Sequence, residues 1–264
     1  MTGSLPATSV PRGRMMGRIC LVTGGGTGIG LASARLMADE GAAGVVIAGR
    51  RADEGEAAAA TCRAAGAEAL FVRTDVTVEE EVARLVETVL TRFGRLDVAF
   101  NNAGYQEKRT PIDEQSAEVF DAVFSANVRS VFLCLRHQIP AMVAQGRGSI
   151  VVNTSVSGVR NPNPGLAVYS ASKAAVISLT RSAAMECAPR GVRINAIAPG
   201  RVVTPMMMAA ASGIGGVEAV AAGLPLRRMG RPEEVAEAVV WLASDQAGYV
   251  VGHVLAADGG FLAA

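Results

Sequence analysis

The sequence lacks the features that mark several classes of protein. Its four cysteines are scattered among 264 residues without a C-x-x-C motif, which predicts no metal site and no disulfide framework and favours the reducing cytoplasm. No apolar stretch reaches 18 residues, so we expect no transmembrane helix and no membrane partner. A net charge of +1 provides no basic surface for a nucleic acid. With 50% hydrophobic and 19% charged residues, the chain is not expected to be disordered.

Residues 1–16 show no periodicity and no apolar segment typical of a signal peptide. We expect them to form a disordered tail or a tag that takes no part in function, with Met15 or Met16 as a candidate natural start. No linker or change of composition divides the remaining chain, so residues 17–264 are predicted to form one domain.

Short apolar segments alternate with longer segments of helical periodicity in this domain. We predict strands at 18–22, 44–48, 69–72, 96–100, 149–153, 192–197 and 254–256. We predict helices at 31–40, 52–65, 78–93, 116–144 (bent at Pro140), 168–189 and 231–244. The pattern predicts the α/β class, with a single Rossmann-type, doubly wound parallel sheet of about seven strands and helices on both faces.

Glycine or polar residues follow six of these strands, at the edge where such sheets bind ligands. The first group is the turn Thr23–Gly30, with glycines at Gly24, Gly28 and Gly30 and with Gly26, Thr27 and Ile29 between them. Because glycine has no Cβ, the backbone and the start of the next helix can approach a pyrophosphate, so we predict a nucleotide site here. The other groups are Arg50, Asp75, 101–104, 154–155 and 199–200.

Tyr169 and Lys173 are four residues apart near the start of a predicted helix, so they share one face. A tyrosine exchanges protons poorly at neutral pH because its reference pKa is about 10, and a nearby ammonium stabilises the phenolate. Lysine is scarce, since only Lys108 and Lys173 occur among 25 basic residues. A lysine at this position indicates a need for a compact charge that arginine does not supply.

Two further polar residues are candidates for the same site. Ser155 follows a strand, where its hydroxyl could bind a substrate oxygen, although Ser157 competes for this role and a simple turn serine is the alternative. Asn127 lies inside an apolar helix, so it is either buried with partners or positioned for function.

Over residues 17–262 the chain resembles the classical short-chain dehydrogenase/reductase family. Its enoyl-reductase branch spaces the tyrosine and lysine more widely than this chain does. The matching motifs are Thr23-Gly24-x-x-x-Gly28-Ile29-Gly30, Asp75-Val76, Asn101-Asn102-Ala103-Gly104, Asn127, Ser155, Tyr169-x-x-x-Lys173 and Pro199-Gly200 with Thr204.

The resemblance implies an NAD(P)(H)-dependent oxidoreductase that interconverts a ketone or aldehyde and an alcohol. Tyr169 is then the general acid/base, Ser155 holds the substrate oxygen, Lys173 binds the nicotinamide ribose and lowers the pKa of Tyr169, and Asn127 orders a water in a proton relay. The implied cofactor contacts are Asp75 and Val76 at the adenine, Asn102, Ala103 and Gly104 along the cofactor, and Pro199, Gly200, Val202 and Thr204 toward its carboxamide end. An epimerase or dehydratase with bound NAD, and a non-catalytic cofactor-binding regulator, are the alternatives on this fold.

The end of the second strand favours NADP(H), with NAD(H) as the alternative. Gly49 stands where relatives that prefer NAD carry an aspartate, and Arg50 and Arg51 follow directly. A guanidinium can bind a 2′-phosphate with two parallel hydrogen bonds. In the alternative, these arginines are solvated, and Asp53 or Glu54 turns back to the ribose; Thr27 also lacks the basic side chain of some NADP-binding relatives.

Residues 204–223 are rich in methionine, alanine and glycine and carry little charge. They predict a lid over a small, uncharged and partly apolar substrate, with a helix packed on the core as the alternative. The helix 116–144 is apolar around much of its circumference, which predicts a second buried face against another subunit. The resemblance places this helix and the one after Tyr169 in a four-helix interface, and residues 258–260 in another, so we expect a homotetramer, with a dimer as the alternative.

Overall fold

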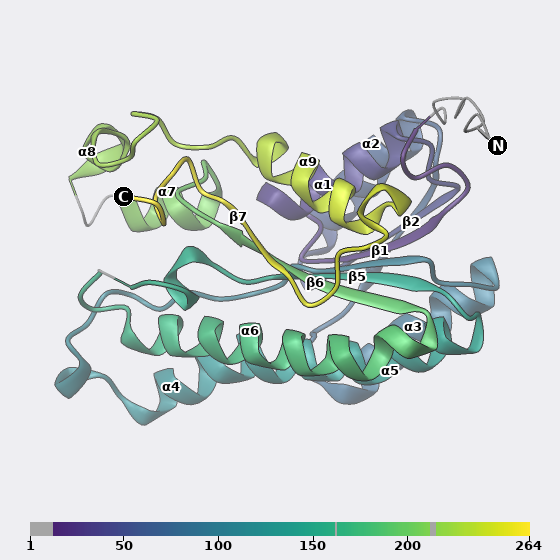
Figure 1. Ribbon diagram of the computed structural model, residues 1–264, viewed down its shortest axis with the longest axis horizontal. Coiled ribbons are helices and arrows are strands. Elements are labelled where there is room, and N and C mark those ends of the chain that lie inside the picture. Colours follow the sequence, from purple (N-terminus) through teal and green to yellow (C-terminus); the bar gives the residue numbers. More distant parts are fainter. Residues whose placement is uncertain (1–12, 162, 212–214) are drawn as a thin grey trace, which may run out of the picture.

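The computed structural model describes residues 13–161, 163–211 and 215–264 and contains a seven-stranded sheet (Figure 1). All neighbouring strands are parallel, in the order β3-β2-β1-β4-β5-β6-β7, so the predicted doubly wound sheet is confirmed. The strands are β1 Ile19–Thr23, β2 Gly44–Gly49, β3 Glu68–Arg73, β4 Val98–Asn101, β5 Gly148–Asn153, β6 Val192–Pro199 and β7 Val254–Ala257.

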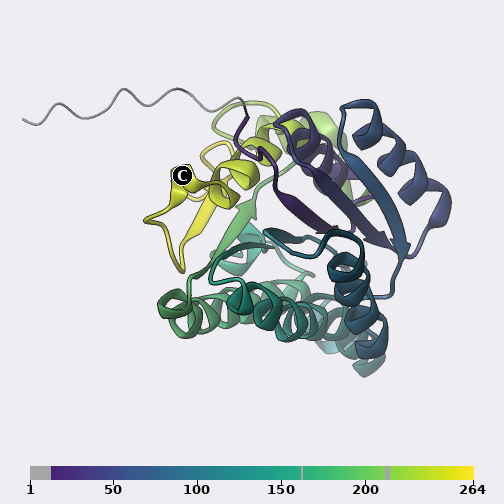
Figure 2. The same cartoon turned by 90° about the vertical axis from the view of Figure 1, so that its right-hand side faces the viewer.

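Helices cover both faces of the sheet. Figures 1 and 2 show α1, α2 and α9 on one face and α3, α5 and α6 on the other, with α4 packed against α6. The helices are α1 Gly28–Asp39, α2 Ala52–Ala64, α3 Glu79–Phe93, α4 Ala117–Phe124, α5 Ser130–Ala144, α6 Ala167–Cys187, α7 Pro205–Ala211, α8 Gly216–Ala222 and α9 Pro232–Ala243.

Two hydrophobic cores follow from the alternation of side chains along each strand. In β1, Cys20 and Val22 face the core under α1, α2 and α9, whereas Ile19 and Leu21 face the core under α3, α5 and α6. Both sets are buried. This two-sided burial is the reason that the strands are apolar throughout rather than alternating.

The register of the strands aligns their carboxyl ends. Thr23 at the end of β1 lies beside Ala48 of β2 and Asn101 of β4. Asn153 at the end of β5 lies beside Ile197 of β6. The residues that follow these strands therefore meet at one edge of the sheet, as the sequence predicted.

The predicted helix 116–144 is interrupted earlier than expected. A π-helical turn at Ser125–Arg129 separates α4 from α5, whereas Pro140 lies within α5. A π turn accommodates an extra residue in the helix and is frequent at functional sites. This turn contains the buried Asn127, so the irregularity coincides with a candidate site residue.

The predicted tail was too long by four residues. Met15 is fully buried in the core under α1, and its N–H donates to the Glu40 carbonyl oxygen at 3.1 Å. Arg14 forms ion pairs with Glu40 and Glu237 at 2.6 and 2.7 Å. Residues 13–16 thus pack on the domain through contacts with later segments, which local periodicity does not reveal, and residues 1–12 lie outside the described residues.

The predicted lid 204–223 contains α7 and α8, and residues 212–214 lie outside the described residues. Within the parts of the chain that the structure describes, no single helix is long and apolar enough to cross a membrane. Helices α7 and α8 pass that test of length and composition only as a pair, across a sharp bend.

We predict that Met15→Ala lowers the free energy of unfolding by about 2–3 kcal/mol, because truncating a buried methionine loses apolar burial and leaves a cavity. Met16→Ala is the matched control, since Met16 is 57% exposed. Urea denaturation of both variants measures the difference. Equal stabilities would show that residues 13–16 contribute nothing to the domain.

Candidate active site

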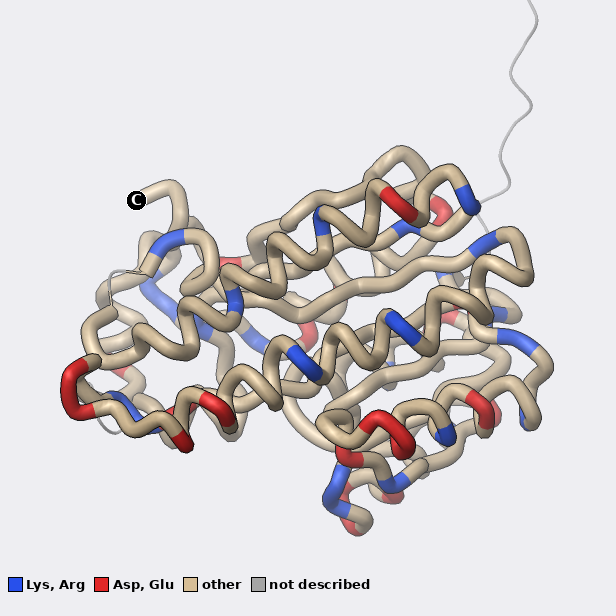
Figure 3. Tube along the Cα trace, turned by 90° about the horizontal axis from the view of Figure 1, so that it is seen from below, with Lys and Arg blue, Asp and Glu red and all other residues tan. Residues whose placement is uncertain are grey.

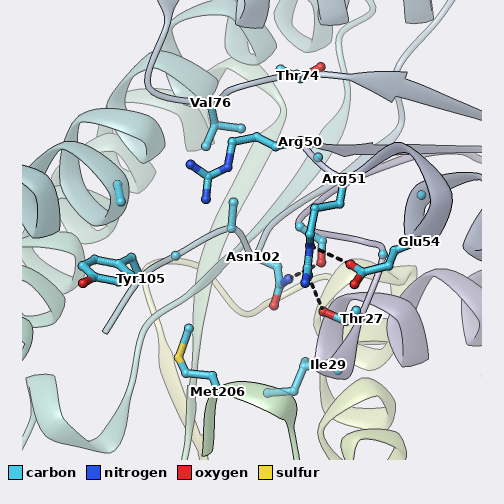
Figure 4. Close-up of a pocket in the computed structure, with 18 of the residues that line it drawn as sticks. Thr27, Ile29, Arg50, Arg51, Glu54, Thr74, Val76, Asn102, Tyr105 and Met206 are labelled. Atoms are coloured by element: carbon cyan, nitrogen blue, oxygen red, sulfur yellow. Dashed lines mark hydrogen bonds and ion pairs between the residues drawn. The ribbon is translucent and has the colours of Figure 1, made fainter. Parts of the chain in front are cut away.

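A cavity of about 410 Å³ lies at the carboxyl edge of the sheet, beside the glycine-rich turn (Figure 4). The structure brings together at its wall most of the residues that the sequence predicted for a cofactor. They are Gly24, Gly26, Thr27, Gly28, Ile29, Arg50, Arg51, Asp75, Val76, Asn102, Ala103, Gly104 and Thr204.

The glycine-rich turn is a cradle that side chains would fill. Gly24 and Gly28 have φ angles of +62° and +55°, which only glycine adopts readily. A Cβ on Gly30 would lie 2.3 Å from the Gly24 carbonyl oxygen, so Gly30 supports the turn from behind. Thr27 makes no side-chain hydrogen bond to the start of α1, which leaves N–H groups there for an anion such as a phosphate.

Two arginines at the end of β2 face this cavity differently. Arg50 reaches over it toward Val76, and its side chain is 75% exposed and 4.0 Å from the Asp75 carboxylate. Arg51 turns toward Thr27, donating to Oγ1 at 3.3 Å, and pairs with Glu54 at 2.6 Å. The Glu54 carboxylate is therefore engaged by Arg51.

A chain of amide and hydroxyl groups ties the strand ends together. The Asn102 side chain donates to the Gly24 carbonyl oxygen at 3.0 Å and accepts from Asn153 Nδ2 at 2.9 Å. The Thr23 hydroxyl accepts from the Asn102 N–H at 3.0 Å. These bonds fix the ends of β1, β4 and β5 relative to one another. Thr23 and Asn153 were not among the predicted site residues, although Thr23 follows one predicted strand and Asn153 ends another.

Tyr169, Ser155 and Lys173 gather beside this network, all less than 10% exposed. The Lys173 ammonium donates to the Asn153 carbonyl oxygen at 3.0 Å and lies 5.8 Å from the centroid of the Tyr169 ring. Ser155 Oγ accepts from the Ser157 N–H at 3.1 Å. The sequence left Ser155 and Ser157 as competitors, and the contact with Tyr169 belongs to Ser155, whose hydrogen bond lowers the pKa of that tyrosine against the larger effect of burial.

Asn127 is buried with all its polar atoms paired. Its Oδ1 accepts from the Tyr105 N–H, and its Nδ2 donates to the Tyr105 carbonyl oxygen, both at 2.8 Å. Nδ2 also donates to Ser172 Oγ at 2.9 Å. Asn127 therefore joins the π turn, the segment after β4 and α6, which positions it close to Lys173.

Burial dominates the ionisation of the tyrosine–lysine pair. Burial raises the pKa of Tyr169 above its ordinary value of 10, while Ser155 and Arg201 lower it and Glu107 raises it. Burial also lowers the pKa of Lys173 to about 8. The pKa of Tyr169 is therefore raised on balance, because desolvation of the phenolate outweighs the nearby charges.

Glu107 is a buried residue of the site that the sequence analysis missed. One of its carboxylate oxygens accepts from the Tyr169 N–H at 3.0 Å, in the first turn of α6. A carboxylate at the start of a helix accepts a hydrogen bond from an N–H group that has no partner within the helix. The positive end of the helix dipole also stabilises its negative charge. Glu107 thus holds the backbone of Tyr169 from a distant segment, a contact for which the sequence offers no local signal.

Three predicted residues at and just after the end of β6 do not line the cavity. Pro199 ends β6, and the Gly200 N–H donates to the Ala257 carbonyl oxygen at 3.0 Å. Val202 is buried and forms a parallel bridge with Gly230. Thr204, which does reach the cavity, accepts from the Met207 N–H at 3.2 Å at the start of α7.

Comparisons with known proteins identify the family. A family model described as enoyl-(acyl carrier protein) reductase matches residues 24–262. Cis-4-hydroxycyclohexanecarboxylate dehydrogenase from Sinomonas cyclohexanicum is 44% identical over 93% of this chain and 97% of its own. A solved short-chain dehydrogenase/reductase family protein is 42% identical over 95% and 100% of the two chains, with a TM-score of 0.84. This chain belongs to the short-chain dehydrogenase/reductase family.

As a short-chain dehydrogenase/reductase, the protein is an oxidoreductase. The crystal structure of levodione reductase superposes with a TM-score of 0.92 at 38% identity, covering 95% of this chain and 99% of that one. The family uses NAD(P), and the glycine cradle and the uncapped start of α1 fit the phosphates of such a cofactor.

The lowered pKa of Lys173 predicts how stability changes with pH. Between about pH 8 and 10.5 the unfolded chain keeps a proton on this lysine that the folded chain has lost. The free energy of unfolding should therefore rise with pH in this window, by up to about 1.4 kcal/mol per pH unit from Lys173 alone. Urea denaturation at several pH values, compared with Lys173→Met, isolates this contribution.

Lys108→Met is the matched control, because Lys108 is exposed and is the other lysine of the chain. We expect it to keep the wild-type dependence on pH, whereas Lys173→Met loses the rise. Parallel curves for the wild type and Lys173→Met would show that the buried ammonium is not destabilised.

Proposed function

We propose that this protein interconverts a ketone or aldehyde and an alcohol by hydride transfer with NAD(P)(H), with Tyr169 as the general acid/base. The observation that carries the proposal is the convergence of Tyr169, Ser155 and Lys173 next to a cavity lined by the glycine-rich turn. In the direction of reduction, the cofactor supplies the hydride, and the chain supplies the proton and the orientation.

Each residue near Tyr169 has a role that its contacts support. Tyr169 donates its phenolic proton to the substrate oxygen, and Ser155 holds the same oxygen by a hydrogen bond. The Lys173 ammonium, which Asn153 holds 5.8 Å from the tyrosine ring, stabilises negative charge on the phenolate. Asn127 holds the Tyr105 backbone and Ser172, and the family resemblance assigns to it the ordering of a water through which the proton is restored.

We infer a small cyclic substrate from the relatives and from the cavity wall. Two of the similar proteins are named for the oxidation of a hydroxycyclohexanecarboxylate and the reduction of levodione. In this chain, Tyr105 and Met206 line the cavity beside the cofactor residues, and both are exposed enough to contact a bound molecule. Met206 is the second residue of α7 in the predicted lid. Its flexible apolar side chain therefore lies where a ring would enter the cavity.

We predict that Tyr169→Phe lowers kcat by at least about 100-fold, because it removes the proton donor, while the cofactor still binds within a factor of about three. Steady-state kinetics with a cyclic ketone and fluorescence titration of the cofactor measure the two effects.

Ser155→Ala should lower kcat strongly. Ser157→Ala is the control, because its backbone N–H still donates to Ser155 Oγ.

Wild-type rates in Tyr169→Phe would remove the tyrosine from the mechanism. Net consumption of reduced cofactor with a ketone distinguishes a reductase from an epimerase, a dehydratase or a cofactor-binding regulator.

We propose NADP(H) as the preferred cofactor, with NAD(H) as the alternative. Gly49 provides no carboxylate for a ribose 2′-hydroxyl, and Glu54 is paired with Arg51. Arg50 has its guanidinium over the cavity, with Asp75 as a loose partner at 4.0 Å, so it is available for a 2′-phosphate.

Arg50→Ala should raise KM for NADPH by about 10-fold, the low end for a charge-assisted hydrogen bond because Arg50 is largely exposed, and should leave KM for NADH unchanged. The readout is the ratio of kcat/KM for NADPH over NADH in the wild type and the variant. A wild-type preference for NADH, or an unchanged ratio in Arg50→Ala, would exclude this role of Arg50.

We propose that the protein assembles as a homotetramer through two interfaces, one at the face of α4, α5 and α6 and the other at residues 258–260. Phe120, Phe132 and Met185 on these helices are 45%, 47% and 60% exposed. Figure 3 looks onto this side of the molecule, where most of the tube carries neither a basic nor an acidic residue. Apolar side chains exposed on neighbouring helices are typical of a subunit interface.

Light scattering at micromolar concentration should give a mass near four times 27.1 kDa. Phe132→Glu should lower that mass, because it places a charge in the interface. A wild-type mass of one chain would contradict the proposal. The mass of a dimer would show that only one of the two proposed interfaces forms.

A further inference from the structure

Two arginines, Arg201 and Arg109, have no carboxylate partner among the described residues. Arg201 follows β6, and Arg109 lies in the segment after β4. Both are half-buried. Arg201 donates to Asn163 and Arg109 donates to Pro164, the next residue along the chain, so both guanidiniums reach the same segment. The charge of Arg201 also lowers the pKa of Tyr169, against the larger effect of burial.

Neutral groups are the hydrogen-bond partners of both guanidiniums within the described part of the chain. Arg201 Nη2 donates to Asn163 Oδ1 at 2.7 Å, and its guanidinium lies 5.8 Å from the centroid of the Phe261 ring. Arg109 Nη1 donates to the Pro164 carbonyl oxygen at 2.7 Å, and its buried Nε has no hydrogen-bond partner among the described residues. Each arginine therefore keeps donors for an additional acceptor.

The other charged groups near this pair have partners of their own, apart from one oxygen of Glu107. Arg160 donates to main-chain oxygens of Phe261 and Ala264, and its guanidinium lies 5.9 Å from the centroid of the Phe261 ring. Asp258 accepts from the N–H groups of Gly260 and Leu262, both at 2.9 Å. Glu107 accepts from the Tyr169 N–H with one oxygen, and its other oxygen has no hydrogen-bond partner within the described part of the chain.

Two half-buried guanidiniums repel each other and lose hydration, and both costs fall when an anion binds between or beside them. Consistent with this, burial and the charge of Arg109 lower the pKa of Arg201. Arginine also matches a carboxylate geometrically, because two of its N–H groups can donate in parallel.

We infer that the substrate carries a carboxylate, which Arg201 binds with support from Arg109, at the end of the molecule away from the reacting carbonyl. The inference rests on the proposed oxidoreductase function and adds the chemical class of its substrate. The carboxylate takes no part in the reaction: the carbonyl carbon gains the hydride, the carbonyl oxygen gains the proton from Tyr169, and the carboxylate remains ionised.

This class of substrate differs from the uncharged one that residues 204–223 suggested. Those residues supply the apolar wall, including Met206, and fit the ring of a small cyclic ketone. Arg109 and Arg201 come from other segments, and the fold brings both to residues 163–164. A cyclic keto acid satisfies both features, with an apolar body and one anionic end.

The test compares 3- and 4-oxocyclohexanecarboxylate with their methyl esters as substrates. We expect kcat/KM for at least one acid to exceed that for its ester by about 10- to 100-fold, the range for a charge-assisted hydrogen-bond pair. Arg201→Ala should abolish this preference, mainly through KM for the acid, and should change the ester by less than about threefold. Arg35→Ala, an exposed arginine of α1 paired with Asp39, is the matched control and should keep the preference.

Equal kcat/KM for acids and esters in the wild type, or an equal loss for both in Arg201→Ala, would overturn the inference and leave the proposed function standing. If neither the acids nor the esters react, the proposed function fails. The binding of a carboxylate to Arg201 is then tested separately, without turnover. Calorimetry should then detect cyclohexanecarboxylate but not cyclohexanecarboxamide, with affinity lost in Arg201→Ala and kept in Arg35→Ala. Failure of cyclohexanecarboxylate to bind more tightly than the amide would overturn it.

Discussion

The candidate site depends on the burial of the Lys173 ammonium at the carboxyl edge of the sheet. This side chain is 4% exposed, and the Asn153 carbonyl oxygen is its hydrogen-bond acceptor in the described structure. A buried charge is costly unless polar groups surround it, so the fold must hold Asn153, Asn102 and Thr23 in place. The parallel register of β1, β4 and β5 does this, because it brings the three residues to the same edge.

Helix α6 carries both Tyr169 and Lys173, and two distant segments of the chain fix its position. In the first turn of α6, the Glu107 carboxylate accepts from the Tyr169 N–H. Asn127 in the π turn donates to Ser172, which directly precedes Lys173. Phenol and ammonium thus keep their separation because the same helix bears them and two distant segments anchor that helix. Such pre-organisation lets the site stabilise developing charge without rearranging.

Much of this architecture could be predicted from the sequence. The apolar strands and their flanking glycines predict the sheet, and the Tyr169–Lys173 spacing predicts one shared helix face. The features that the sequence did not reveal depend on distant contacts: Met15 packs on α1, Glu107 reaches α6, and Arg201 meets Tyr169. The π turn at Ser125–Arg129 also lacked a signal, because Pro140 was the evident break in a helix whose periodicity is otherwise continuous.

The central claim, hydride transfer to a carbonyl carbon, is tested most directly with NADPH carrying deuterium at both C4 positions. Reaction with a cyclic ketone in ordinary water should give an alcohol with one deuterium on the carbinol carbon, detected by mass spectrometry. The same reaction with unlabelled NADPH in D₂O should place none on that carbon. A product that takes its carbon-bound hydrogen from water, or an alcohol without deuterium in the first reaction, would contradict the account.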